Sequence, residues 1–213
     1  MSSKHEWRKH EKPFYLPKTK PELIEIPEFK FIAIKGQGNP NNSDFSNYVE
    51  ALYSLAYGIK MNLKKLDCPP KNYVDFTVYP LEGEWDITDE AKAIFDGEIN
   101  KDDLVYELMI RQPEYVDEVF FNQIKTLVKA KKSNALIDSV EFKVIKEGPC
   151  VQMLHLGPFE DEPASFAQME RFAEELGISR LSKLHREIYL SDPRRVTPDK
   201  YKTVLRFKAQ PTK

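Results

Sequence analysis

The chain of 213 residues repeats its own apolar pattern after about half its length. The segments 23–55 and 144–176 each contain two strand-like apolar runs, then a glycine and a proline, then a helical stripe. Gly36 aligns with Gly157, and Leu55 aligns with Leu176, without a gap. A half of this kind has a sheet face that its own helix leaves uncovered. The repeat therefore predicts two similar modules that complete one another.

Each half predicts the order strand–helix–strand–strand, because apolar residues recur first at every second position and then at i, i+3, i+4 and i+7. The first strand-like runs, which could pair as separate strands, cover 23–26 and 29–34 in the first half, and 142–145 and 150–156 in the second. The helical stripes cover 45–59 and 166–176, and the strands that follow them cover 73–79, 104–111, 185–190 and 203–208.

The predicted fold class is α+β, a tandem pseudo-two-fold repeat of strand–helix–strand–strand modules. Its antiparallel sheets carry the helices on one side and a central ligand pocket on the other. Residues 1–20 are predicted to be an irregular lead-in, and residues 21–213 a single domain. Within that domain the boundaries are 21–113 for module one, 116–132 for a connecting helix and 139–211 for module two.

Composition excludes several function classes. A net charge of -2 gives no field that attracts nucleic acid or an anionic membrane. The two cysteines and four histidines lack the spacing of a disulfide framework or a metal site, so no metal and no cofactor are predicted. No apolar run approaches the ~20 residues of a membrane span, and no N-terminal stretch resembles a signal peptide. A cytoplasmic protein is expected.

The strand 185–190 has two unlike faces. His185, Glu187 and Tyr189 share one face, and Ile188 and Leu190 share the other, because successive strand side chains alternate. A carboxylate between aromatic residues is costly to bury unless the strand lines a cavity. The strand 73–79 has a comparable row, with its apolar even positions expected to meet the helix. The alternative is that both rows face solvent, as half-exposed strands often do.

Other candidate residues lie near turns. Trp85 follows the turn after Pro80, where an indole either walls a pocket or covers the end of a core. His155 precedes the sequence Gly157-Pro158-Phe159 and is either a structural donor or a ligand contact. No nucleophile elbow, phosphate-binding loop or dinucleotide fingerprint is present.

Four segments together resemble a known family: 79–85, 108–113, 151–159 and 185–193. They are similar to the stand-alone GyrI-like proteins, relatives of the gyrase-inhibitory protein and of drug-binding domains of multidrug-responsive regulators. The resemblance runs from about Glu22 onward. It implies a tandem strand–helix–strand–strand fold whose central pocket is lined by aromatic residues and one buried glutamate, matched here by Glu187. In the drug-binding relatives that glutamate faces cationic aromatic ligands.

One branch of the family hydrolyses the cyclopropane ring of DNA-alkylating antibiotics of the duocarmycin class. The chain resembles this branch in its Leu-Glu-Gly-x-Trp and Glu-Ile-Tyr-Leu-Ser-Asp-Pro segments. It departs from the branch at Arg186, where a second histidine is frequent, and at Tyr106, where a tryptophan is frequent. Either change could alter the size or kind of ligand accepted.

The first hypothesis is therefore a detoxifying hydrolase that opens an activated cyclopropane with water. Glu187 would position or deprotonate the water, and Tyr189 or Tyr106 would donate a hydrogen bond to the developing phenolate oxygen. The predicted catalytic residues are Glu187 and Tyr189, and the predicted ligand-binding residues are Trp85, Tyr79, Tyr106, His155 and Phe159. The alternative is a non-catalytic module that sequesters or senses lipophilic cations, as an effector-binding partner of a regulator. A third role, protection of gyrase, has no specific support. The expected partner is a hydrophobic aromatic small molecule, with no direct nucleic acid and no membrane, and the edge strands leave a homodimer open.

Overall fold

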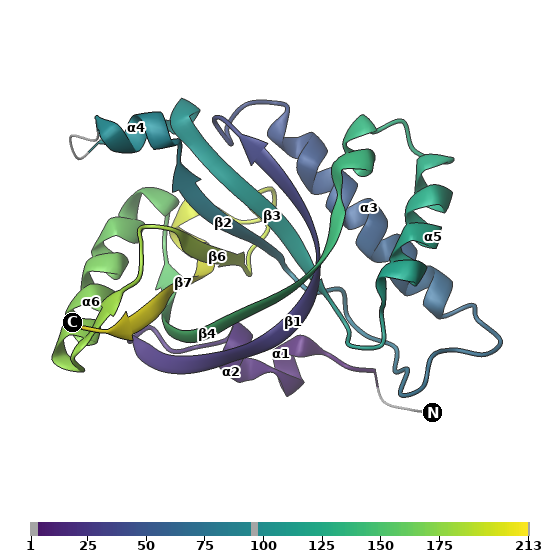
Figure 1. Cartoon of the computed structure of the whole chain (residues 1–213), viewed down its shortest axis with the longest axis horizontal. Helices are drawn as coiled ribbons and strands as arrows, with labels where there is room; N and C mark the ends of the chain where they lie inside the picture. The colour runs from purple at the N-terminus through teal and green to yellow at the C-terminus, as the bar shows by residue number, and fades with distance from the viewer. Residues whose placement is uncertain (1–3, 95–97, 213) are drawn as a thin grey trace. The chain divides into compact units, whose positions relative to one another are not determined.

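The structure is a computed structural model that describes residues 4–94 and 98–212. In chain order its elements are α1 (Trp7–His10), α2 (Lys12–Tyr15), β1 (Glu22–Gln37), α3 (Phe45–Leu63), β2 (Leu81–Ile87), α4 (Asp89–Ala93), η1 (Lys101–Asp103), β3 (Leu104–Gln112), α5 (Glu118–Lys129), η2 (Ala135–Ser139), β4 (Glu141–Leu156), η3 (Phe159–Asp161), α6 (Glu162–Glu175), β5 (Ile178–Arg180), β6 (His185–Tyr189), η4 (Pro198–Lys200) and β7 (Lys202–Pro211) (Figure 1).

The order of elements confirms the predicted α+β class. The first half runs β1, α3, β2, β3, and the second runs β4, α6, β6, β7 with the short β5 added. The described residues form two compact units. The first unit contains the residues up to Glu6, 29–81 and 86–145, and the second contains 7–28, 82–85 and the residues from Lys146 onward.

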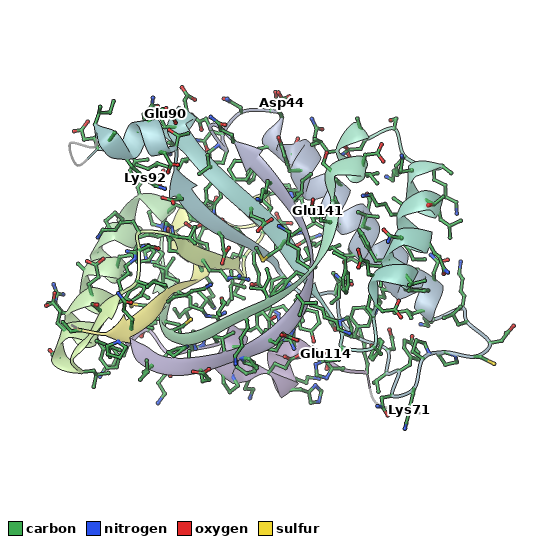
Figure 2. The ribbon with its side chains drawn as sticks, in the orientation of Figure 1. Asp44, Lys71, Glu90, Lys92, Glu114 and Glu141 are labelled. Carbon is green, nitrogen blue, oxygen red and sulfur yellow. The ribbon has the colours of Figure 1, made fainter. Side chains whose placement is uncertain are left out.

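In the first unit, β1 and β3 pair antiparallel from Lys30 opposite Gln112 to Gln37 opposite Val105. Helices α3 and α5 lie side by side (Figure 1). Gly58 permits this close packing, because a Cβ atom there would lie 2.9 Å from a methyl group of Val128. On α4, Lys92 forms an ion pair with Asp86 of β2 at 2.7 Å, and Glu90 is exposed (Figure 2).

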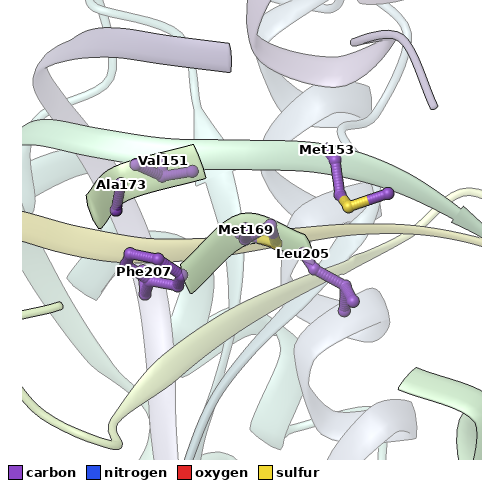
Figure 3. Close-up of a cluster of buried hydrophobic side chains, with 6 residues drawn as sticks. All are labelled: Val151, Met153, Met169, Ala173, Leu205 and Phe207. Atoms are coloured by element: carbon purple, nitrogen blue, oxygen red, sulfur yellow. The ribbon is translucent and has the colours of Figure 1, made fainter. Parts of the chain in front are cut away.

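In the second unit, β6 pairs antiparallel with both β2 and β7, and β7 also pairs with β4 and β5. Helix α6 buries Met169 and Ala173 against Val151, Leu205 and Phe207 of the strands, together with Met153 (Figure 3). The helix ends before Gly177, whose φ of 67° is costly for other residues. Glycine is the residue that commonly follows a helix at this position.

The N-terminal lead-in is not irregular, contrary to its predicted form. It contains α1 and α2, which bury Trp7 and Tyr15 within the second unit. Burial of these two aromatic side chains stabilises the two short helices, although most other residues of the segment are polar.

The predicted strand 73–79 is wrong. Within it only Phe76 makes a bridge, a parallel one to His5, and the regular strand β2 begins after Pro80. Side chains occupy the backbone acceptors that a ladder would use: the Tyr115 hydroxyl donates to the Val74 carbonyl, and the Lys60 ammonium to the Phe76 carbonyl. The segment is therefore held extended without strand neighbours.

The paired runs at the start of each half are also joined rather than separate. β1 is one strand through Pro27, and β4 is one strand through Pro149. Proline fixes φ near −65°, a value that extended chains tolerate, so it removes a hydrogen-bond donor without ending the strand.

Candidate functional site

Strand β6 presents its predicted polar row within the second unit. Glu187 is 9% exposed, and His185 and Tyr189 are half-buried. On the neighbouring strand β2, Trp85 lies opposite His185, and Gly83 lies opposite Glu187. Since glycine has no side chain, β2 places nothing directly opposite the carboxylate. The solvent-facing alternative for this row is therefore wrong, because its central carboxylate is buried.

A continuous set of hydrogen bonds converges on Glu187. The Trp85 indole N–H donates to the Tyr189 hydroxyl oxygen at 2.7 Å, and the Tyr189 hydroxyl donates to Glu187 Oε2 at 2.8 Å. His185 Nε2 lies 3.2 Å from Glu187 Oε1. Burial, followed by the charge of Glu187, raises the pKa of Tyr189 well above its ordinary value. Tyr189 therefore remains a phenol and keeps donating to the carboxylate.

A second carboxyl group, Glu162 of α6, joins the site, so the expectation of one buried glutamate is wrong. Glu162 is 6% exposed and hydrogen-bonded to Glu187. Burial and the neighbouring charge of Glu187 raise the pKa of Glu162 well above that of a free carboxyl. Its Oε1 is buried and has no hydrogen-bond partner among the described residues. The site thus contains a protonated carboxyl beside Glu187.

Sequence periodicity could have revealed Glu162. It stands four residues before Phe166 and seven before Met169, and therefore on the buried stripe of α6. A carboxyl group at a core position of an amphipathic helix is unusual enough to indicate a site. Helix α6 contacts the polar row itself, through Phe166 at His185 and Glu162 at Glu187.

Replacing Glu162 with glutamine is expected to flatten the pH dependence of stability. The folded state holds a carboxyl proton that the unfolded chain releases above about pH 4.3, so wild-type stability falls as pH rises from there. Glutamine resembles the neutral carboxyl but does not titrate. Thermal unfolding should therefore favour the variant over wild type more at pH 8 than at pH 5. Glu174→Gln, an exposed change on the same helix, should show no such trend. If stability fell with pH as steeply in Glu162→Gln as in wild type, the raised pKa of Glu162 would be contradicted.

Aromatic rings surround the carboxylate pair. The Phe159 ring meets Tyr189 edge-on at 6.0 Å and lies 5.3 Å from Tyr201. Phe166 of α6 meets His185 edge-on at 4.7 Å. Phe159 remains 37% exposed, so part of this aromatic surface is open to solvent. An anion beside open aromatic surface suits ligands that are flat, apolar or cationic.

His155 holds the turn that leads into α6. Its Nε2 lies 3.0 Å from the Pro158 carbonyl, and its Nδ1 lies 2.9 Å from the Ser165 hydroxyl. A carbonyl only accepts, so Nε2 carries the hydrogen and Nδ1 accepts from Ser165. His155 and Ser165 also border an open groove of ≈ 490 Å³ that includes Thr19, Asp161 and Gln168. A ligand-binding role for His155 remains a prediction.

Tyr79 and Tyr106 belong to the first unit, where each has its own neighbours. The Arg111 guanidinium lies 4.8 Å from the ring centre of Tyr79. Tyr106 packs edge-on against Phe45 at 5.4 Å and Tyr48 at 5.7 Å, and burial raises its pKa to about 12. The ligand-binding roles of both tyrosines remain predictions.

Arg186 points away from the polar row into a buried ionic cluster. It contacts Glu82 at 2.8 Å, Glu84 at 2.9 Å and Glu147 at 2.9 Å. Arg206 extends the cluster through Glu147 and Gln152, and through the carbonyl of Phe14 in α2. The face of β6 that carries Ile188 thus also carries a buried arginine with three carboxylate partners.

A family model described as the GyrI-like small molecule binding domain matches residues 19–208. The chain belongs to the GyrI-like family. This GyrI-like domain is a small-molecule-binding domain by membership, and the converging hydrogen bonds at Glu187 lie within the matched residues.

Solved structures similar to this GyrI-like chain include two described as a hydrolase from Listeria innocua. One is 36% identical with a TM-score of 0.85 and covers 97% of this chain and 100% of its own. The other is 38% identical with a TM-score of 0.86 and covers 98% and 100%. The EcmrR C-terminal domain, 15% identical with a TM-score of 0.51 over 91% and 98%, shares the fold. A comparison with curated proteins finds no match.

Two classes of feature are not seen in the described part of this GyrI-like chain. Residues 4–94 and 98–212 contain no group of three or more His, Cys, Asp or Glu side chains arranged to hold a metal ion. Over the same residues, no helix combines the length and apolarity needed to span a membrane.

Proposed function

We propose that this GyrI-like protein binds flat hydrophobic aromatic molecules and hydrolyses the activated cyclopropane ring of DNA-alkylating compounds. The observation that carries the proposal is the buried Glu187, on which Tyr189 and His185 converge, beside the buried Glu162, whose pKa burial raises. A base and an acid are the two groups that water addition to a strained ring requires. The hydrolase relatives from Listeria innocua, 36–38% identical over nearly the whole chain, support an enzymatic reading.

The proposed reaction needs no covalent enzyme intermediate. Water attacks the cyclopropane methylene carbon and forms a C–O bond while Glu187 accepts the proton. The ring C–C bond breaks, and its electron pair moves into the conjugated carbonyl, which becomes a phenolate oxygen. Glu162 donates a proton to that oxygen, or Tyr189 donates a hydrogen bond to it once its bond to Glu187 is released, and such donors in a dry site lower the barrier. Trp85 and Phe159 supply stacking surface for the flat substrate.

The direct test is to incubate the purified protein with a duocarmycin-class cyclopropane and follow the products by mass spectrometry. The expected product is heavier by one water molecule and forms faster than in buffer alone. Formation at the buffer rate would contradict the enzymatic proposal. Expression of the protein in bacteria exposed to the same compound would test the inferred role in cytoplasmic detoxification. In this role the protein acts on the small molecule without a nucleic-acid or membrane partner.

The second candidate is a binding module for lipophilic cations. The same carboxylate and rings favour it, because each cation–π contact contributes about 0.5–2 kcal/mol. Saturable binding of a cationic dye such as ethidium, without turnover of the cyclopropane, would favour this candidate. Sedimentation at micromolar concentration would show whether the protein acts as a monomer or a homodimer.

Tyr189→Phe is expected to weaken ligand turnover or affinity about tenfold, since one hydroxyl links the indole and the carboxylate. Its loss removes the hydrogen bond from the Trp85 N–H and the hydrogen bond to Glu187 Oε2. Calorimetric titration and turnover measurements would quantify the effect. The exposed Tyr57→Phe is the matched control and should behave as wild type. Equal behaviour of the two variants would show that the Tyr189 hydroxyl does not serve the site.

A further inference from the structure

Arg180, at the end of β5, holds the loop that precedes β6. Its Nε donates to the Ser182 carbonyl at 2.8 Å, and one terminal nitrogen donates to the Lys183 carbonyl at 2.5 Å. The other terminal nitrogen meets Glu170 at 3.1 Å. The side chain is only 11% exposed. A planar guanidinium can reach two successive carbonyls and a carboxylate at once, which an ammonium cannot do in the same geometry.

Two partners of Arg180 are also the groups that orient His185. The Lys183 carbonyl, which Arg180 holds, lies 3.1 Å from His185 Nδ1. The Phe166 ring, which lies 4.9 Å from the Arg180 guanidinium carbon, meets the His185 ring at 4.7 Å. The Lys183 carbonyl and the Glu187 carboxylate both only accept, so each contact is a hydrogen bond when the ring nitrogen that faces it carries the hydrogen. The imidazole plane is thus fixed from two directions by groups that Arg180 contacts.

The other nitrogen of His185 faces the reactive carboxylate. With Nδ1 on the Lys183 carbonyl, Nε2 is brought to 3.2 Å from Glu187 Oε1. Rotation of the ring would remove this contact and leave Oε1 to other neighbours. Tyr189 holds Oε2 of the Glu187 carboxylate, and the contact at Oε1 depends on a ring that the Lys183 carbonyl holds in place.

We propose that Arg180 is a positioning residue, which fixes the loop 181–184 and, through His185, the orientation of the Glu187 carboxylate toward its ligand. This inference deepens the proposed function and rests on it for the ligand step. Its hydrogen bond to the Lys183 carbonyl and its contact with the Phe166 ring both lead to His185, and His185 in turn contacts Glu187. The Glu170 carboxylate anchors the guanidinium at 3.1 Å. Lys183 Nζ contacts the same carboxylate oxygen at 3.1 Å, so Arg180 and Lys183 meet at Glu170.

The test compares Arg180→Lys with Arg171→Lys, an exposed change on α6 that keeps the same chemistry. In the Arg180 variant the imidazole ¹⁵N and ring ¹H resonances of His185 should shift, while those of His155, in the same unit, stay in place. Turnover of the duocarmycin-class cyclopropane should fall about tenfold, mostly in kcat, because a misdirected base is costly even when the ligand still binds. The Arg171 variant should match wild type in both measurements.

Phe166→Leu is the second variant, for use if Arg180→Lys does not fold. It removes the ring shared by Arg180 and His185, and should shift the same His185 resonances with a smaller loss of kcat. Unchanged His185 resonances in a folded Arg180→Lys protein would overturn the inference. If wild type neither binds nor turns over the cyclopropane, the proposed function fails, and the His185 resonances still decide whether Arg180 positions that ring.

Discussion

Glu187→Gln should reduce cyclopropane opening about 10²–10⁴-fold, the range for loss of a general base, with the fold retained. Glutamine keeps the shape of the side chain, and its carbonyl oxygen can still accept from the Tyr189 hydroxyl. It cannot take a proton from water. The site would therefore still bind the substrate but would lose the group that activates its nucleophile. Single-turnover measurements with excess enzyme would separate the chemical step from binding.

The same variant distinguishes the two candidate functions. An uncharged aromatic ligand should bind Glu187→Gln as it binds wild type, whereas a cation such as ethidium should bind less tightly because the anion is gone. Loss of cation binding in a protein that never showed turnover would favour the sensing or sequestering module. Glu174→Gln serves as the control for a glutamate change elsewhere in the second unit. Turnover within twofold of wild type in Glu187→Gln would show that this carboxylate is not the base.

Sequence patterns predicted the fold where periodicity was clean. The stripes 45–59 and 166–176 became α3 and α6, and the alternating runs at 104–111, 185–190 and 203–208 became β3, β6 and β7. They were wrong at 73–79, where the alternation is as regular but Lys60 and Tyr115 take the backbone carbonyls. Alternation reports which faces differ, and it does not report which hydrogen-bond partners a strand will find.

For the site, the sequence and the family resemblance identified Glu187, Tyr189 and Trp85, which the structure joins by hydrogen bonds. Strand alternation does not identify Glu162, because this residue lies on the buried stripe of a helix. Arg186 was read as a substitution affecting ligand preference, although strand alternation places it on the opposite face from Glu187. Its partners come from β2 and β4, far away in sequence, and no local pattern could have supplied them.

Arg186→Met should destabilise the protein by about 3–5 kcal/mol, the cost of removing one partner from a buried ion pair. Arg186 is 3% exposed, and the change leaves Glu82, Glu84 and Glu147 near one another with Arg206 as the remaining guanidinium. Methionine fills much of the arginine volume, so the loss reports unpaired charge more than an empty cavity. Urea unfolding monitored by circular dichroism would measure it. Arg195→Met, at an arginine whose side chain is 82% exposed, should cost under about 0.5 kcal/mol.

The pH dependence of this loss identifies its cause. Burial favours a neutral Glu147, yet in the intact cluster the guanidiniums of Arg186 and Arg206 prevail and lower its pKa, so Glu147 contributes stability that is lost as pH falls. For Glu82, burial outweighs the attraction of Arg186 and raises the pKa. Without Arg186 the carboxyls of Glu147 and Glu82 ionise less readily, and the variant should recover stability as pH falls. The difference between wild type and Arg186→Met should therefore be smaller at pH 5 than at pH 8. Adding Glu82→Gln should restore part of the stability at pH 8, because it removes one of the stranded charges. A deficit that is constant with pH, and that Glu82→Gln does not relieve, would assign the loss to packing rather than to the ionic cluster.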